Sequence, residues 1–178
     1  MQLRHGPVPE CGPEGKHYIS TSGPGIAGPA VFSYEMWFRT SSNGGKLAGF
    51  QDSQTKATGT NDRILYMNDN GKLIFAVAPG GTMKTIISPA AYNDGSWHHT
   101  AVTLSSTGMN LYVDGAKVAA AADVTTPRTM AKGWWLFGDG DLNNWPDAGA
   151  SAFNGQLDNI AVYNTVALTP AHYRAGAP

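Results

Sequence analysis

Carboxylic acids are the first residues in this sequence that could do chemistry, because pairs of them cleave glycosidic bonds. Such a pair stands about 5–5.5 Å apart in retaining enzymes and about 6.5–9.5 Å apart in inverting ones. Residues i and i+2 of a strand share a face, so alternating acids would supply the pair. Glu35 instead has Ser33 and Trp37 at that spacing, and Asp139 and Asp141 flank a glycine in a loop. The sequence therefore predicts no glycosidase centre.

Two adjacent histidines, His98 and His99, are the next candidates, as metal ligands or as a catalytic base. They begin a predicted strand, where neighbouring side chains point to opposite faces, so the two cannot chelate one ion. The other histidines, His5, His17 and His172, lie far away in the sequence, and no nucleophile-elbow motif presents a serine. We interpret the pair as structural histidines and predict that the chain is not an enzyme.

One tryptophan is a candidate for ligand binding, because it lies in a polar segment without core periodicity. Trp145 falls in the segment 139–152, which is rich in aspartate and asparagine and long for a connection in a compact β-protein. Sugars present apolar faces to aromatic rings and hydroxyl groups to polar side chains. We therefore predict a glycan site with Trp145 as its platform and with hydrogen bonds from Asp141, Asn143 or Asn144. The alternative is that Trp145 folds back and caps one end of the fold.

The elements that must position these residues are strands joined by tight turns. Asp114-Gly115 and Asn70-Gly71 each separate two alternating apolar runs, which is typical of hairpins with type I′ turns. No segment shows a long 3.6-residue period, so the chain is predicted to be all-β, a two-sheet antiparallel β-sandwich. The alternation places the following residues between the sheets: Phe32, Tyr34, Met36, Phe38, Val102, Leu104, Leu111 and Val113.

A carboxylate and a guanidinium stand side by side at the start of one of these strands, at Asp62 and Arg63. Structural ion pairing, with other partners of the two residues or with Glu35, is the first interpretation, and contact with a ligand is the alternative.

Bulk composition limits the classes of function. The 178 residues carry 12 Lys and Arg against 13 Asp and Glu, a net charge of −1, which argues against the basic surface that nucleic acids require. No apolar run reaches the roughly 18–20 residues of a membrane helix. We predict one domain over 17–178 behind a flexible leader over 1–16, which holds the single cysteine, Cys11. Thr169-Pro170 is typical of the start of a short helix.

Four stretches, in order, resemble one family. They are FSYEMWFRT at 32–40, DRILYMNDNGKLIFAV at 62–77, NDGSWHHTAVTL to MNLYVDGAKV at 93–118, and FNGQLDNIAVYNTVALTPAHY at 153–173. Together they are similar to laminin-G-like (LamG-like) jelly-roll modules of the concanavalin A-like lectin/glucanase superfamily. The resemblance implies a concanavalin A-like jelly roll that covers most of the chain.

The resemblance also implies a structural Ca²⁺. Related modules often hold this ion through an aspartate of the closing strand, and the LDNIAVY stretch carries that role to Asp158. In the alternation Asp158, Ile160, Val162 the aspartate shares the inward face, where a carboxylate must be paired, hydrogen-bonded or metal-bound. The alternative is that Asp158 accepts backbone N–H groups. A second, weaker candidate for calcium is the spacing Asp139-x-Asp141-x-Asn143.

These observations lead us to expect a non-catalytic binding or adhesion module, which binds a glycan or cell-surface polysaccharide in a secreted or surface-displayed bacterial protein. The alternative is a structural or interaction module without a small ligand, such as a phage tail or capsid-decoration protein. No apolar stretch of the kind found in signal peptides follows Met1, which favours the alternative and a place in the virion.

Overall fold

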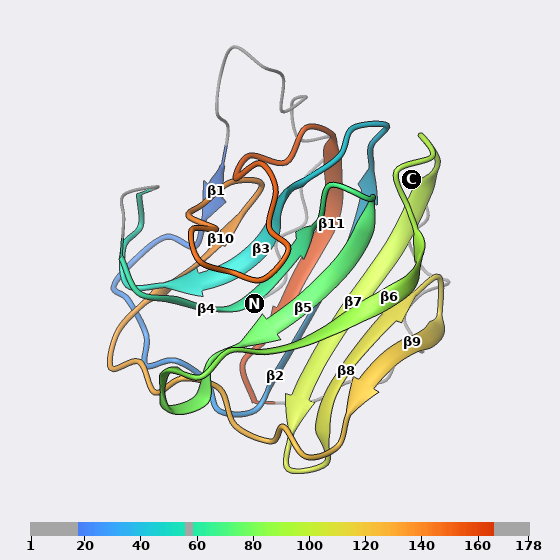
Figure 1. Ribbon diagram of the computed structural model, residues 1–178. Coiled ribbons are helices and arrows are strands. Elements are labelled where there is room, and N and C mark those ends of the chain that lie inside the picture. The colour runs from blue at the N-terminus through green and yellow to red at the C-terminus, as the bar shows by residue number, and fades with distance from the viewer. Residues whose placement is uncertain (1–17, 56–58, 166–178) are drawn as a thin grey trace.

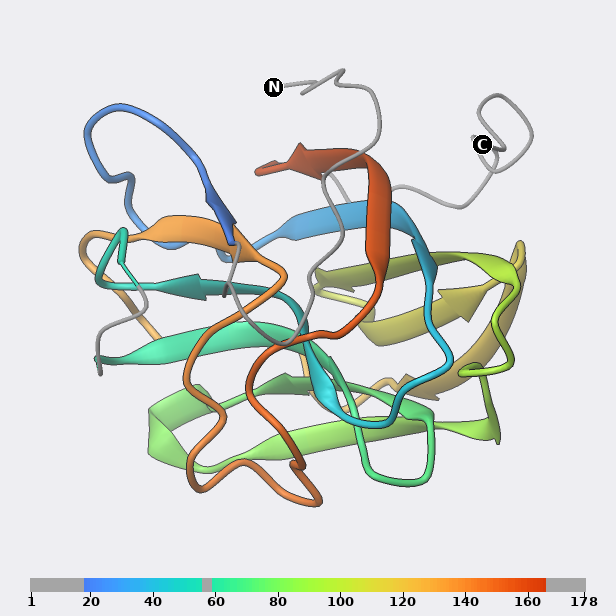
Figure 2. The ribbon, with the colours of Figure 1, turned by 90° about the horizontal axis from the view of Figure 1, so that it is seen from above.

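Two antiparallel sheets packed face to face make up residues 18–55 and 59–165, the part of the chain that the computed structural model describes (Figure 1, Figure 2). The prediction of an all-β, two-sheet jelly roll is confirmed. No helix in this part is long and apolar enough to cross a membrane. The predicted leader 1–16 with Cys11, and the short helix predicted from Thr169, lie outside the described residues.

Neighbouring strands in both antiparallel sheets are often not consecutive in the sequence, because the chain crosses from one sheet to the other. The larger sheet is ordered β1 (Ile19–Ser20), β10 (Trp134–Phe137), β3 (Gly45–Gln51), β4 (Asn61–Met67), β5 (Lys72–Val77) and β6 (Lys84–Ala91). The smaller sheet is ordered β11 (Gln156–Tyr163), β2 (Phe32–Arg39), β7 (Trp97–Ser105), β8 (Gly108–Val113) and β9 (Ala116–Ala121). A short 3₁₀ turn, η1 (Pro79–Gly81), joins β5 to β6.

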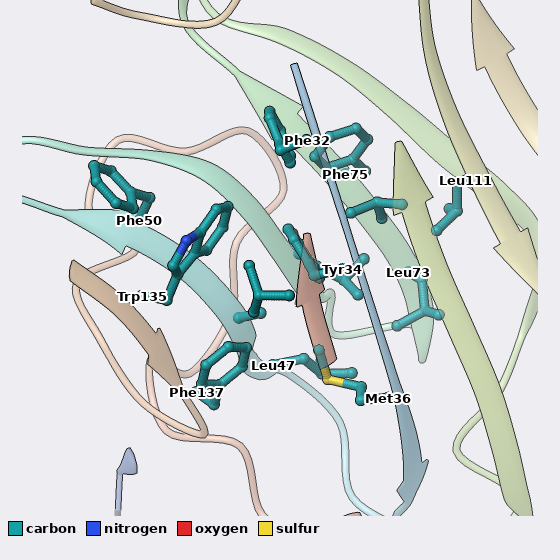
Figure 3. Packing of buried hydrophobic residues seen from close by; sticks show 14 of the residues in the cluster. Phe32, Tyr34, Met36, Leu47, Phe50, Leu73, Phe75, Leu111, Trp135 and Phe137 are labelled. Carbon is teal, nitrogen blue, oxygen red and sulfur yellow. The ribbon is translucent and has the colours of Figure 1, made fainter. Parts of the chain in front are cut away.

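The core between the sheets contains all eight residues predicted for it, each at most 2% exposed. Aromatic rings from both sheets meet at its centre (Figure 3), where the Tyr34 ring lies edge-on to Trp135 at 5.3 Å and to Phe75 at 6.4 Å between centroids. Aromatic pairs in such geometry contribute about 0.5–1.5 kcal/mol beyond their buried area. For these eight residues the period-two alternation of the sequence therefore assigned the strand faces correctly.

The two predicted hairpin turns differ in the structure. Asp114 and Gly115 both have positive φ, 50° and 79°, as a type I′ turn requires. At the β4–β5 turn only Gly71 has positive φ, so the type I′ prediction for Asn70-Gly71 is wrong. Asn68 N donates to Lys72 O at 2.9 Å, which closes a three-residue loop with glycine in the left-handed position.

A second, smaller apolar cluster lies on the outer face of the six-stranded sheet, the side away from the core. The segment 139–152 crosses this face in front of β3 and β4 (Figure 1). Its Leu142 and Trp145 pack against strand residues of β4 and β5 and against Ala78, which follows β5: Ile64, Tyr66, Ile74, Ala76 and Ala78. The sheet is thus covered locally by a long connection, which brings polar loop residues next to the β4–β5 turn.

Candidate ligand-binding site

Trp145 fixes the covering segment to the sheet. Its side chain is 7% exposed and packs in the outer cluster, while its indole Nε1 donates to Asn61 Oδ1 at 2.7 Å. The hydroxyl of Tyr66 donates to the carbonyl of Pro146. Trp145 folds back onto the fold, as the alternative predicts, but it covers the outer face of the six-stranded sheet and does not cap an end of the sandwich. The platform role of Trp145 stays a prediction.

A buried lysine underlies the same segment. The Lys46 ammonium is fully buried and donates to Gln51 Oε1 at 3.2 Å. Burial lowers the pKa of Lys46 to about 8, although the carboxylates of Asp139 and Asp141 act in the opposite direction. A Cβ added to Gly140 would come within 2.5 Å of the Lys46 Nζ, so only glycine lets the segment approach so closely. The lysine therefore ties the start of the segment to β3.

Where the segment meets the β4–β5 turn, the surface forms a depression of about 560 Å³. We call it the loop depression, and its lining comes from the turn, from β5 and β6, and from the covering segment: Asn68, Asp69, Asn70, Lys72, Ile87, Asp147 and Ala148. Ile87 is 44% exposed and supplies an apolar surface beside the polar groups. From the segment 139–152, Asp147 and Ala148 line this depression, and neither is among the residues predicted to bind a ligand.

Asn68 holds the walls of the loop depression in place. Its side-chain Oδ1 accepts the backbone N–H groups of Asn70 and Lys72, each at 3.0 Å. Its backbone forms an antiparallel bridge with Ala148, and its carbonyl accepts the Gly44 N–H at 3.1 Å. The side chains of Asp69, Asn70, Lys72 and Asp147 therefore project from a backbone that is already fixed, which reduces the entropy lost on binding.

The polar residues predicted from the segment lie elsewhere on it. Asn143 and Asn144 are exposed, and Asp141 is half-buried with its Oδ1 accepting the Asn143 N–H at 2.7 Å. None of them lines the loop depression, and their role in binding stays a prediction. Sequence reasoning missed the group 68–72, because it treated the polar Asn-Asp-Asn run only as a turn.

Asp158 does not point inward, as the alternation predicted. Asp158 pairs with Trp37, which is on the outer face of β2, whereas Leu157 pairs with Phe38 in the core. A β-bulge at Asn159, whose φ is 49°, then returns Ile160 to the core. The inserted residue shifts the phase of the strand, so the inward orientation predicted for Asp158 is wrong.

Asp158 is the residue to which the resemblance assigns a structural Ca²⁺, and the structure shows its hydrogen bonding. Its Oδ1 accepts the Asn159 N–H at 2.7 Å, and Ca²⁺ takes six to eight oxygen ligands. Across 18–55 and 59–165 no three His, Cys, Asp or Glu side chains form a group that could hold a metal ion. At the weaker candidate, the Lys46 ammonium already stands against Gly140, between Asp139 and Asp141 in the chain. Calcium binding by Asp158 therefore stays a prediction.

The candidates for catalysis have structural partners. Glu35 Oε2 lies 3.4 Å from His99 Nε2, and Tyr163 donates its hydroxyl to Glu35 Oε1 at 3.1 Å. His98 contacts Asp114 through Nδ1 at 2.7 Å and Asp94 through Nε2 at 3.2 Å. The two histidines serve opposite faces of β7, as predicted. Glu35 has Ala101 and Ala161 as its cross-strand neighbours, so the ladder supplies no facing carboxylate.

Asp62 and Arg63 have the structural role that was predicted, but they pair with each other and not with Glu35. Arg63 Nη1 donates to Asp62 Oδ1 at 3.2 Å, and both side chains are at most 1% exposed. The guanidinium also donates to the carbonyls of Pro29 and Arg128, and Asp62 accepts the Ala78 N–H at 2.7 Å. These bonds fasten two loops to the start of β4.

Comparison with known proteins agrees with this architecture. The family model described as the concanavalin A-like lectin/glucanases superfamily matches residues 13–172. Neurexin like receptor 1 of Caenorhabditis elegans is 31% identical over 96 residues, which are 54% of this chain, and the chain spans only 7% of that protein.

Two solved structures show the same fold. Domains LG4-5 of the mouse laminin alpha1 chain match with a TM-score of 0.62 and 25% identity, covering 87% of this chain and 40% of that chain. The CBM40 of a Ruminococcus gnavus IT-sialidase, bound to alpha2,3 sialyllactose, matches with a TM-score of 0.63 and 16% identity, covering 89% and 95%.

Proposed function

This chain is a LamG-like jelly-roll module of the concanavalin A-like lectin/glucanases superfamily, and from this premise we propose that it binds carbohydrate without cleaving it. The loop depression is the proposed site. The module belongs, in this proposal, to a secreted or surface-displayed protein, as adhesion modules do, and its partner is a glycan or cell-surface polysaccharide.

One observation carries the proposal: the loop depression joins polar side chains to one exposed aliphatic. Two aspartates, Asn70 and Lys72 offer acceptors and donors to sugar hydroxyl groups, and Ile87 offers an apolar surface to sugar C–H groups. Each hydrogen bond adds about 0.5–1.5 kcal/mol net. Association itself costs at least several kcal/mol, so we expect weak binding that repeated ligands strengthen through avidity.

The comparisons support the proposal at the level of the fold. The CBM40 structure is bound to alpha2,3 sialyllactose, and the laminin match is to domains LG4-5 of the mouse laminin alpha1 chain. Laminin-G-like relatives also support an extracellular setting. Fold alone does not determine function, so the proposal depends on the loop depression and on its test.

The test is a glycan array that carries neutral, acidic and amino glycans, followed by titration of every hit. We expect Asn70→Ala and Ile87→Ser to weaken binding about threefold to tenfold. Ile26→Ser is the matched control, because Ile26 is similarly exposed, at 40%, and does not line the loop depression.

Each outcome bears on the proposal. Binding that falls in both depression variants and persists in Ile26→Ser supports it. Equal affinity in all three variants would place the site elsewhere on the module. The absence of any hit would favour the alternative, a structural or interaction module such as a phage component, which a search for protein partners would then address.

A further inference from the structure

The charges around the loop depression bear on the class of sugar that it takes, and the following inference rests on the proposed function. Asp69 and Asp147 contribute two carboxylates, and Lys72 contributes one ammonium. The Lys46 ammonium is fully buried beneath the segment 139–152 and does not add to the exposed charge. The lining therefore has an excess of negative charge.

Both carboxylates are available to a ligand. Asp69 and Asp147 are exposed, and neither accepts a hydrogen bond nor forms an ion pair with another residue of 18–55 or 59–165. Asp147 has a φ of 52°, and its neighbour Ala148 is held by a bond from its N–H to the Trp145 carbonyl at 3.3 Å. The backbone that presents these acids is thus fixed before a ligand arrives.

The negative charge of Asp147 acts on the adjacent sheet. Burial raises the pKa of the Tyr66 phenol above its ordinary value, and the Asp147 carboxylate raises it further. The Tyr66 hydroxyl donates to Pro146, the residue before Asp147. The Asp147 carboxylate therefore acts across the edge of the covering segment on the sheet beside the loop depression.

We propose that the loop depression takes an amino sugar whose amine is free and protonated, with the ammonium facing the carboxylates of Asp69 and Asp147. An N-acetylated sugar lacks the positive charge, and an acidic sugar would meet two like charges. Exposed ion pairs each change affinity by a factor of up to about five, and salt screens them. Lys72 donates to hydroxyl groups of the same ligand.

Titrations with three oligosaccharides test this inference: a glucosamine tetramer, its fully N-acetylated counterpart, and alpha2,3 sialyllactose. They are done at about pH 6, so that the free amines of the glucosamine tetramer carry protons, with EDTA present so that no metal ion bridges ligand and protein. We expect the glucosamine tetramer to bind about fivefold to twentyfold more tightly than the N-acetylated one at low salt, and the difference to shrink in 0.5 M NaCl.

Variants localise the effect. Asp147→Asn and Asp69→Asn should each weaken the glucosamine tetramer about threefold to fivefold and leave the N-acetylated one within twofold. Asp123→Asn is the control, because Asp123 is exposed in the turn after β9 and does not line the loop depression. The salt dependence of binding is measured on the wild-type protein, so this readout does not depend on whether a variant folds.

The outcomes separate this inference from the proposed function. Equal affinity for both tetramers, or tighter binding of sialyllactose, would overturn the preference for ammonium while glycan binding stands. Loss of binding in Asp123→Asn as large as in the depression variants would also overturn it. Failure of every glycan to bind, here and on the array, would overturn both.

Discussion

Two residues attach the segment 139–152 to the sheet, one by apolar packing and the other by its charge. Trp145 contributes buried apolar area and one indole hydrogen bond, whereas Lys46 contributes a buried charge near Asp139 and Asp141. The stabilisation from the apolar contact does not depend on pH, whereas the stabilisation from the Lys46 charge does. Single substitutions can therefore separate the two contributions.

Replacement of Trp145 tests its packing on the sheet. Trp145→Ala should lower the free energy of unfolding by about 3–5 kcal/mol, as for other large buried side chains, when measured by urea denaturation. Trp145→Leu fills part of the space and should cost less. A loss below about 1 kcal/mol in Trp145→Ala would contradict the packing described here.

The same variant addresses the platform role that the sequence predicts for Trp145. Trp145→Leu removes the aromatic face, so a platform role requires weaker glycan binding by on the order of 1–3 kcal/mol. If Trp145 only packs on the sheet, as its 7% exposure favours, affinity should be unchanged in titrations at a temperature where the variant is folded. A large loss would support the platform role.

The Lys46 charge predicts a specific dependence of stability on pH. Its pKa is about 8 in the folded protein against 10.5 ordinarily, so between these values the unfolded chain binds more protons. The free energy of unfolding should therefore rise with pH from about 8 to 10.5 through this group. Comparison of urea midpoints for wild type and Lys46→Met over this range isolates the effect. A difference between the two proteins that does not change with pH would contradict it.

Calcium binding at Asp158 is a sequence prediction that a melting experiment can test directly. If the ion binds, the melting midpoint should be higher in millimolar CaCl₂ than in EDTA. At a hundredfold excess of Ca²⁺ over Kd, the free energy of unfolding should rise by about 2.7 kcal/mol. Asp158→Asn must abolish the rise. An unchanged midpoint in the wild-type protein would contradict the prediction, and a rise that survives in Asp158→Asn would move the ion elsewhere.

Among the elements, strand faces were predictable and local irregularities were not. Strict alternation placed Phe32 and Met36 of β2 in the core, because the side-chain period of a strand is two. The bulge at Asn159 adds one residue to β11 and turns Asp158 outward, and no composition signal marks it. The three-residue turn before Lys72 escaped prediction for a similar reason, since Asn-Gly suits more than one turn type.

The start of β4 depends on its buried ion pair. Removal of one partner from a buried pair leaves an uncompensated charge and typically costs about 3–5 kcal/mol. Arg63→Met should therefore lower the free energy of unfolding by that amount, because Asp62 stays buried. The control is Arg39→Met, since Arg39 is exposed and stacks on Trp97 at 5.3 Å. Equal losses in the two variants would contradict the account.

At the scale of the whole molecule, the candidate site joins parts that are distant in sequence. The turn 68–72, Ile87 of β6 and Asp147 come together only when the six-stranded sheet forms and the segment 139–152 crosses it. The sequence drew attention to the segment 139–152, because a long polar connection is often functional, and its role in binding stays a prediction. It could not indicate the partner turn, because no local pattern encodes which turn lies beside a loop.

The most direct test of the central claim is a ¹H–¹⁵N correlation spectrum of the whole chain, titrated with the best glycan from the array. Binding at the loop depression predicts that the largest shift changes map to Asp69, Asn70, Lys72, Ile87 and Asp147, with small changes on the outer face of β7 and β8. Shift changes centred on the five-stranded sheet, or none at saturating glycan, would contradict the claim that this module binds carbohydrate at the loop depression.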